Sequence, residues 1–278
     1  MVEFLFDEKR HEYTLNGHML TSVSKFIEHF TQPFDNELWS LYTAIRNKLD
    51  MDKKEFSTYL VRNYGYNFKG DRDENLKFLH VLADRLGGVD VYETQKKWKD
   101  GNIASQIKGT NFHNMKENKV IVDGGTKVEG EYFKHYRIPD LTNLNKDVPA
   151  VYTELRMFNA EFGLAGTSDK VLVWPNKEFY ILDYKTNREI KMENKWQKMK
   201  PPISHMDDTN YSHYVLQLST YAWMLEQFGY RCKGTKFIHY DIDETGKPGR
   251  ETEYIFRPRF KEVKNMLKEF KNGSSNSL

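Results

Sequence analysis

The chain has 278 residues, of which 38% are hydrophobic and 29% are charged, and these are ordinary proportions for a folded globular protein. The aromatic share of 14% argues against intrinsic disorder. Because 42 basic residues stand against 40 acidic ones, the formal charge is only +2, which excludes a global positive field for a polyanionic partner. Any surface that binds nucleic acid must therefore be local.

The chain contains one cysteine, Cys232, which excludes an internal disulfide and a cysteine-ligated zinc or iron–sulfur centre. Any bound metal must be held by oxygen and imidazole ligands. The first residues include no apolar stretch of signal-peptide length, and no run approaches the roughly 18 apolar residues of a membrane span. We therefore expect an intracellular, cytoplasmic protein with no membrane partner. The cytoplasm of a phage- or virus-infected host cell also fits this expectation.

The first part of the chain predicts a small hairpin followed by helices. The dipeptide Asn16-Gly17 favours a tight turn beside alternating apolar residues, and the segment Thr21-Ser22-Val23-Ser24 is expected to cap a following helix. Residues 36–118 have mostly helical patterning, with breaks near Tyr64-Gly65 and at Gly87-Gly88.

Residues in the middle of the chain predict three consecutive strands. Residues 151–158 alternate in polarity as a half-buried strand does, and residues 164–174 and 178–185 flank the turn at 175–177. Such short connections predict an antiparallel meander. Residues 186–208, which contain a basic stretch and two prolines, are expected to form a long loop.

The last part of the chain predicts one helix, two strands and a second helix. Apolar positions recur at helical spacing over 210–227, where Gly229 follows as a stop signal. Strands are expected at 235–242 and 251–256, with a helix from about residue 259.

These elements predict an α/β fold with a mixed central sheet flanked by helices and an N-terminal helical elaboration. We assign the hairpin and helical elaboration to residues 1–100, the core to 101–271 and a flexible tail to 272–278. We expect the first two segments to form one compact unit.

We expect the functional site at the C-terminal end of the third strand of the meander, residues 178–185. Asp183 and Lys185 share a face of this strand because residues two apart in a strand point the same way. A short hairpin would place Asp169 of the preceding strand beside them. Two adjacent carboxylates repel unless a cation lies between them, an arrangement that suits Mg²⁺ or Mn²⁺.

An isolated Asp-x-Lys is more often a surface ion pair, so this spacing alone is a weak signal. Two further pairs at helical i, i+4 spacing strengthen the functional interpretation, namely His113 with Glu117 and Gln217 with Tyr221. Among these residues, His113, Asp169, Asp183 and Lys185 give two carboxylates, an imidazole and an ammonium for one site.

This set resembles the PD-(D/E)xK nuclease superfamily, in particular its RecB-like exonuclease branch, which includes mitochondrial genome maintenance exonucleases and many phage and viral nucleases. The matched segments follow the order of the branch, cover roughly the C-terminal two-thirds of the chain, and are 109–113, 163–169, 181–186 and 217–221. The resemblance implies a restriction-endonuclease-like core.

The resemblance also implies roles for individual residues. His113, Asp169, Asp183 and the backbone carbonyl of Tyr184 would ligate the metal, which would be Mg²⁺ or Mn²⁺. Lys185 would be the catalytic lysine.

Further residues are implied with less specific roles. Gln217 and Tyr221 would lie on the helix packed against the site, facing the DNA or the catalytic lysine. Glu154 matches an acidic position seen in parts of the superfamily, although a charged residue at a strand edge explains it equally well. The single cysteine departs from branch members that carry an iron–sulfur cluster, so no such cluster is expected. The motif at Asp169 has Gly-Thr-Ser-Asp in place of Pro-Asp.

The loop that follows Lys185 is a candidate DNA-contact segment, because basic side chains can bind phosphates and an indole can stack on a base. A solvated loop is the alternative. The candidate residues are Arg188, Lys191, Lys195, Trp196, Lys198 and Lys200. Four more residues either line the same cleft or pack in the interior, and these are His205, Tyr211, His213 and Tyr214.

The expected activity is that of a metal-dependent exonuclease that hydrolyses phosphodiester bonds at DNA ends, with single-strand preference, in replication, recombination or repair. One alternative is a structure- or sequence-specific endonuclease, and another is a non-catalytic DNA-binding protein on a nuclease scaffold. The helical region 36–100, which is rich in aromatic residues, is a candidate arch for single-stranded DNA, although core packing explains most of its rings.

Overall fold

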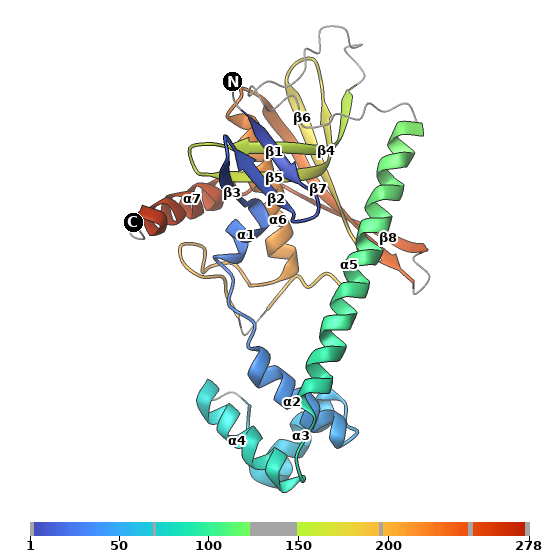
Figure 1. Cartoon of the computed structure of the whole chain (residues 1–278), viewed down its shortest axis with the longest axis vertical. Helices are drawn as coiled ribbons and strands as arrows, with labels where there is room; N and C mark the ends of the chain where they lie inside the picture. The colour runs from blue at the N-terminus through green and yellow to red at the C-terminus, as the bar shows by residue number, and fades with distance from the viewer. Residues whose placement is uncertain (1–2, 69–70, 123–148, 195–196, 244–246, 276–278) are drawn as a thin grey trace. The chain divides into compact units, whose positions relative to one another are not determined.

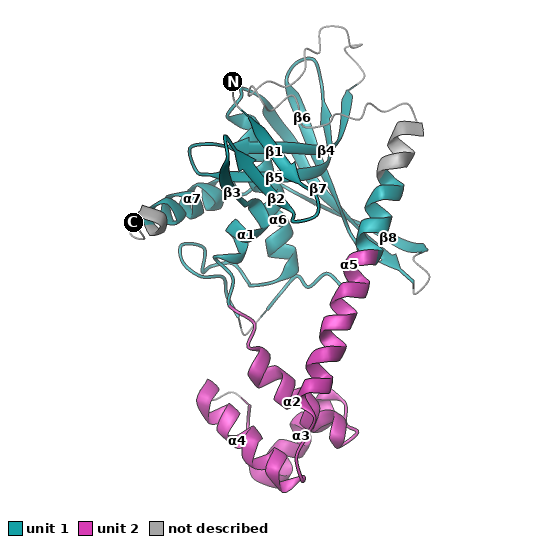
Figure 2. Cartoon of the chain, viewed as in Figure 1, with its two compact units in different colours: residues 1–32, 108–278 teal, residues 33–107 magenta. Residues whose placement is uncertain are grey.

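The computed structural model of the chain describes residues 3–68, 71–122, 149–194, 197–243 and 247–275 (Figure 1). The chain divides into two compact units (Figure 2). Unit 1 comprises residues 1–32 and 108–278, and unit 2 comprises residues 33–107. The N-terminal strands therefore belong with the sheet of unit 1, and the assignment of residues 1–100 to one segment differs from this division.

Unit 1 begins with an antiparallel meander of β1 (Phe4–Asp7), β2 (Glu12–Leu15) and β3 (His18–Ser22). Asn16 and Gly17 connect the last two strands with φ angles of 51° and 79°, as a two-residue hairpin turn requires. The predicted turn is present, and the third strand extends the predicted hairpin to a meander.

The strand β3 leads directly into the short helix α1 (Val23–Glu28). Ser22 caps this helix, because its hydroxyl accepts a hydrogen bond from the backbone N–H of Lys25 at 3.2 Å. A cap was predicted within residues 21–24, and the structure assigns it to Ser22. The same end of β3 pairs in parallel with the start of the central strand β5 (Leu164–Val173).

The predicted three-stranded meander is confirmed. Strand β4 (Ala150–Asn159) pairs with β5, and β5 pairs with β6 (Glu178–Lys185), both antiparallel. Strand β7 (Arg231–Ile242) runs parallel to β6, and β8 (Pro248–Phe256) returns antiparallel to β7. The sheet is therefore mixed.

One edge of β5 carries an interruption that shapes the site. Strand β4 pairs with β5 from Leu164 to Val173, with a gap in the register at Glu154 and Asp169, so β3 and β6 must share the other edge. Strand β3 pairs only with Leu164 and Ala165, and β6 pairs only from Lys170 onward. Among the described strands, none pairs with residues 166–169 on this edge.

Helices cover both faces of the sheet. Helices α1, α6 (Asn210–Glu226) and α7 (Phe260–Ser275) contribute to the main hydrophobic core on one face. On the other face, Phe112 of α5 (Val91–Val122) packs in a smaller cluster with β6 and β7 side chains. An α/β fold with a mixed central sheet flanked by helices was predicted, and this fold class is confirmed.

The C-terminal helix reaches further than expected, since α7 continues to Ser275 within the segment 272–278 that was predicted to be a tail. Residues 276–278 lie outside the described part of the chain. The predicted long loop 186–208 contains no helix or strand where it is described, apart from an isolated bridge between Lys198 and Asp207.

Unit 2 is helical, as predicted for residues 36–118. It contains α2 (Asn36–Lys48), α3 (Lys53–Tyr64), α4 (Arg72–Arg85) and the first part of α5. Gly65 ends α3 with a φ of 61°. These helices share a separate hydrophobic core, in which the aromatic rings of the region pack on one another. In the ranges that the structure describes, no helix combines the length and apolar character needed to cross a membrane.

Candidate metal and lysine site

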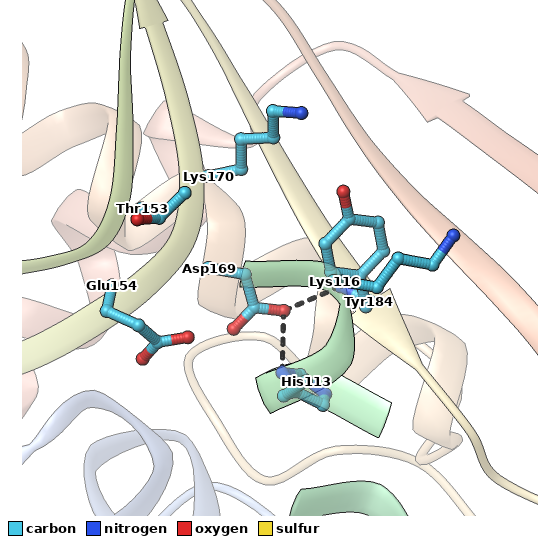
Figure 3. Close-up of a pocket in the computed structure, with 7 residues that line it drawn as sticks. All are labelled: His113, Lys116, Thr153, Glu154, Asp169, Lys170 and Tyr184. Atoms are coloured by element: carbon cyan, nitrogen blue, oxygen red, sulfur yellow. Dashed lines mark hydrogen bonds and ion pairs between the residues drawn. The ribbon is translucent and has the colours of Figure 1, made fainter. Parts of the chain in front are cut away.

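Three side chains from three elements converge beside the interruption in β5. They are His113 of α5, Glu154 of β4 and Asp169 of β5, and one ligand atom from each lies within 4.8 Å of the others. His113 Nδ1 is 3.3 Å from Asp169 Oδ2. All three line a pocket and their polar atoms point toward one another (Figure 3). We call these three residues the ligand half of the site.

Glu154 reaches this group through an unusual backbone conformation. Its neighbours Thr153 and Leu155 pair with Lys170 and Ser168, so Glu154 lies opposite Asp169 across the two strands. Its φ angle is 49°, in the left-handed region that non-glycine residues in strands rarely adopt. Such a conformation costs on the order of 1–3 kcal/mol and is concentrated at functional sites.

Asp169 is anchored to the next strand by its side chain. Its Oδ2 atom accepts a hydrogen bond of 2.7 Å from the backbone N–H of Tyr184. Backbone pairing of β5 with β6 ends at Lys170 and Leu182. Beyond this point the side chain of Asp169 connects the two strands through its hydrogen bond to the backbone of Tyr184. The anchor fixes the distance between the carboxylate of Asp169 and the end of β6.

The His113–Asp169 contact favours the charged forms of both side chains. Burial acts to lower the pKa of His113, but the hydrogen bond and charge of Asp169 outweigh it and raise the pKa to about 8. Burial acts to raise the pKa of Asp169, but the hydrogen bond and charge of His113, with help from Lys185, hold it below its ordinary value. Without a bound cation, the pair is thus stabilised as imidazolium and carboxylate.

The second group of residues starts from the strand end at Asp183 and Lys185. The two side chains share one face of β6 as predicted, and Lys185 Nζ lies 2.5 Å from Asp183 Oδ2. Asp183 is 2% exposed, and its Oδ2 atom has no hydrogen bond of good geometry within the described residues. The ion pair with Lys185 therefore offsets the cost of burying this charge. Removing either partner would leave a buried charge.

Burial and the neighbouring carboxylate act together on Asp183. They raise its pKa to about 6, although Lys185 opposes this effect. Burial acts to lower the pKa of Lys185, but the charges of Asp183 and Asp169 raise it above its ordinary value. Lys185 is therefore a protonated ammonium at neutral pH in this arrangement.

Helix α6 extends the group through hydrogen bonds. Lys185 Nζ donates to Gln217 Oε1 at 3.1 Å, and Gln217 Nε2 donates to the hydroxyl of Tyr221 at 3.3 Å. The spacing of four residues places Gln217 and Tyr221 on one face of the helix, as the sequence predicted. We call Asp183, Lys185, Gln217 and Tyr221 the lysine half of the site.

A glycine makes room for the end of this hydrogen-bonded series. Gly166 lies in the stretch of β5 that has no strand partner on the edge shared by β3 and β6, and a Cβ atom there would come within 2.5 Å of the Tyr221 ring. No real side chain tolerates such a contact without movement. The Gly-Thr-Ser-Asp motif therefore supplies both the Asp169 carboxylate and the space for Tyr221.

Sequence reasoning gave no specific role to three residues that the structure places at the site. Lys185 Nζ lies 4.4 Å from the ring centroid of Tyr214, and Gln217 Nε2 is 3.5 Å from Ser24 Oγ. Lys116 lines the pocket of the ligand half. The spacing of Tyr214 from Gln217 and of Lys116 from His113 is three residues on a helix, which is a usable signal for a shared face.

The donor atoms present are compatible with a divalent metal ion. Two carboxylates and one imidazole within 4.8 Å form an oxygen and nitrogen ligand set that suits Mg²⁺ or Mn²⁺. Asp183, expected as a ligand, is not in this group of three and instead forms an ion pair with Lys185. Glu154 occupies the position of a third ligand. The backbone carbonyl of Tyr184 was also expected as a ligand. The contact of Tyr184 with the ligand half is the hydrogen bond from its backbone N–H to Asp169.

The basic loop is only partly engaged in internal contacts. Lys198 forms an ion pair with Asp207, and Lys191 lies 3.3 Å from Glu189. Lys200 Nζ donates to the carbonyl of His29 at 3.4 Å, and Arg188 is exposed. The predicted contact residues Lys195 and Trp196 lie outside the described residues.

Of the four aromatic and histidine residues expected either in the cleft or in the interior, Tyr214 contacts the site. His205 Nε2 lies 3.4 Å from Glu262 Oε1, and His213 Nε2 donates a hydrogen bond of 2.6 Å to the carboxylate Oδ1 of Asp208. Tyr211 packs edge-on against Phe237 of the core. The contact of Tyr211 matches the interior-packing interpretation, whereas the side chain of His205 is exposed and that of His213 is partly exposed.

Comparisons with known proteins give little beyond this geometry. No family model matches the chain, and no curated protein matches it in sequence. The chain is similar to the crystal structure of SSO0001, with 16% identity and a TM-score of 0.31 over 84% of this chain and 83% of that one. It is also similar to a "Putative exonuclease" from Eubacterium rectale, with 12% identity and a TM-score of 0.28 over 91% and 82%. Likenesses this weak carry no argument about function.

Proposed function

We propose that the protein is a metal-dependent deoxyribonuclease that acts on DNA ends. The observation that carries the proposal is the convergence of the ligand half, with its three ligand atoms within 4.8 Å, next to a buried ion pair of Asp183 and Lys185. The chemistry of this arrangement fits hydrolysis of a phosphodiester. The ordered motifs that resemble RecB-like nucleases support the same activity.

In this proposal His113, Glu154 and Asp169 hold a Mg²⁺ or Mn²⁺ ion, with Asp183 available as a further carboxylate. The ion, when bound, polarises a phosphoryl oxygen and lowers the pKa of a bound water. Its charge would also displace the proton of His113, because an imidazole that ligates a metal must be neutral. Metal affinity therefore increases as the pH rises through about 8, the pKa of His113.

Lys185 is the proposed catalytic residue of the lysine half. Its ammonium is held by Asp183, Gln217 and the ring of Tyr214, so it enters the reaction already oriented. A protonated lysine beside a phosphate neutralises the charge that develops as the nucleophile attacks. Gln217 and Tyr221 are positioning residues, because they act by holding Lys185 through hydrogen bonds.

The substrate we propose is a DNA end, and single-stranded DNA is the preferred form. The resemblance to exonucleases of replication, recombination and repair supports this assignment, and the basic loop beside Lys185 offers the exposed Arg188 and Lys191 for phosphate contacts. A sequence- or structure-specific endonuclease is the alternative within the same chemistry.

Digestion of labelled single-stranded, duplex and circular DNA with Mg²⁺, Mn²⁺ or a chelator tests the proposal. The wild type should degrade linear DNA only with a metal and should leave circular DNA intact. Asp183→Asn should abolish cleavage, and Lys185→Ala should reduce it by about 10²–10³-fold or more. Cutting of circles would favour the endonuclease, and undiminished cleavage by both variants would refute the assigned centre.

A further inference from the structure

A second lysine lies at the site in addition to Lys185. Lys116 is one helical turn after His113 on α5, and it lines the same pocket as Glu154 and Asp169 (Figure 3). The spacing of three residues puts Lys116 and His113 on neighbouring positions of one helix face. The pocket that contains the ligand half is therefore also lined by a cationic side chain, that of Lys116.

Aromatic rings hold the ammonium of Lys116 in place. Its Nζ atom lies 4.1 Å from the ring centroid of Tyr240, 5.3 Å from that of Phe112 and 5.5 Å from that of Tyr184. It also donates a hydrogen bond of 2.8 Å to the Tyr240 hydroxyl. An ammonium against several ring faces is attracted by their quadrupoles and keeps a defined position.

Tyr184 connects this lysine to the ligand half. Its ring contacts Lys116, and its backbone N–H donates to Asp169 at 2.7 Å. The side chain of Lys116 extends past the Tyr184 ring, and its nitrogen points away from the carboxylates of Glu154 and Asp169 (Figure 3). The ammonium is therefore fixed relative to the ligand atoms but displaced from them.

We infer that Lys116 binds the substrate phosphate next to the one held at the ligand half. This inference rests on the proposed nuclease function and deepens it. Phosphates repeat along a nucleic-acid strand, so a cation displaced from the metal ligands meets a neighbouring phosphate. Lysine is well suited to this contact as a compact point charge. The site is thereby specific for a strand with consecutive phosphates over an isolated phosphodiester.

A ratio of two activities tests the inference. The kcat/KM values for a single-stranded oligonucleotide and for bis(4-nitrophenyl) phosphate, which has one phosphate, are measured with Mn²⁺ for the wild type, Lys116→Met and Lys116→Arg. Lys116→Met should lower the ratio of oligonucleotide to single-phosphate activity by about tenfold, through the KM for the oligonucleotide. Lys116→Arg, which keeps the charge and can lie against aromatic rings, should restore most of the ratio.

A matched control is available in Lys177, an exposed lysine in the turn before β6, whose Nζ lies 6.0 Å from the ring centroid of Tyr230. Lys177→Met should leave the ratio unchanged. An unchanged ratio in Lys116→Met would overturn the inference. Equal losses on both substrates together with a lower Tm would also overturn it, because they would indicate a structural role.

A binding measurement separates this inference from the proposed function. In the inactive Asp183→Asn background, log affinity for the labelled oligonucleotide is followed against log salt. Adding Lys116→Met should make the slope shallower by about 0.7, the change for one lost phosphate contact in single-stranded DNA. If the wild type cleaves nothing but the slope changes, the nuclease function fails and the Lys116 contact stands. If cleavage occurs and the slope stays the same, the nuclease function stands and the Lys116 contact fails. If the wild type does not cleave and the oligonucleotide does not bind, both fail.

Discussion

The two halves of the site differ in how far they are open to the outside. In the ligand half, the side chain of His113 is 29% exposed and that of Asp169 is 13% exposed, and both line a pocket. In the lysine half, the side chain of Asp183 is 3% exposed and its charge is met by Lys185. The open half is suited to take up an ion from solution, whereas the closed half holds an ammonium in one orientation. Binding and orientation are thus assigned to different residues.

The largest expected effect separates these two tasks. Asp169→Asn should reduce both Mn²⁺ binding and cleavage, because it removes a ligand charge and the partner of His113. Lys185→Ala should reduce cleavage by about 10²–10³-fold or more while leaving Mn²⁺ binding in place. Calorimetry with Mn²⁺ and a DNA-cleavage assay on the same preparations measure the two properties.

Asp84→Asn provides the matched control, because Asp84 is an exposed carboxylate on α4 of unit 2. It should change neither property. Loss of Mn²⁺ binding in Lys185→Ala equal to that in Asp169→Asn would show that the two halves do not act separately.

The next effect concerns the space that Gly166 leaves for Tyr221. In Gly166→Ala the new methyl group would lie 2.5 Å from Cε1 of a tyrosine that is 3% exposed, so the ring or the strand must move. Such overpacking should lower the free energy of unfolding by about 1–3 kcal/mol. It should also displace Gln217 from Lys185 and reduce cleavage.

Gly101 in α5 is the comparison position, because a Cβ atom there meets nothing within 4 Å. Gly101→Ala should raise the free energy of unfolding by up to about 1 kcal/mol through helix propensity. Chemical denaturation measures both variants. Equal stability of the two would contradict the close packing of Gly166 and Tyr221.

A pH-dependent effect of similar size is expected in the ligand half. The pKa of His113 is raised from 6.5 to about 8 in the fold, so its bound proton favours the folded state. This contribution is complete below about pH 6.5 and is lost as the pH rises through 8. The difference between the two pKa values corresponds to at most about 2 kcal/mol.

Unfolding of the chelator-treated protein between pH 6 and 9 measures this effect, and His113→Gln should flatten the decrease. Asp183 works in a different window, because its raised pKa of about 6 favours the folded state at low pH and this contribution is lost as the pH rises through 6. A wild-type profile that is flat from pH 6.5 to 9 would contradict the His113–Asp169 interaction.

The features that were predictable from sequence are those that depend on neighbours along the chain. Alternation and short turns identified the meander of β4, β5 and β6, and helical spacing placed Gln217 with Tyr221. The interruption in β5 was not predictable, because it arises where β3 pairs with one end of the strand and β6 with the other. Pairing of this kind joins residues far apart in the sequence.

The strand β7 illustrates the same limit. It was expected from residue 235 but begins at Arg231, because its first, polar residues pair with the start of β6. Neither that pairing nor the ring contacts of Lys116 has a local signature. The sequence predicted Asp183 as a metal ligand, whereas the structure places Glu154 with His113 and Asp169. This difference has the same origin, since spacing along the chain gives no information on which carboxylate lies opposite His113.

The smallest expected effect concerns the backbone of Glu154 and bears directly on the ligand half. Its φ of 49° is unfavourable for a residue with a Cβ atom and acceptable for glycine. Without metal, Glu154→Gly should therefore have a free energy of unfolding about 1 kcal/mol higher than Glu154→Gln, which retains the strain. Both variants should bind Mn²⁺ less tightly than the wild type, by about 10-fold or more.

Denaturation with a chelator and calorimetry with Mn²⁺ measure the two quantities on the same proteins. If glycine stabilises the fold while ligand binding is lost, the left-handed conformation exists to aim the carboxylate at His113 and Asp169 and not to support the strand. Greater stability of Glu154→Gln than of Glu154→Gly would show instead that the side chain at this position supports the pairing of β4 with β5, and that the ligand half is held together by His113 and Asp169.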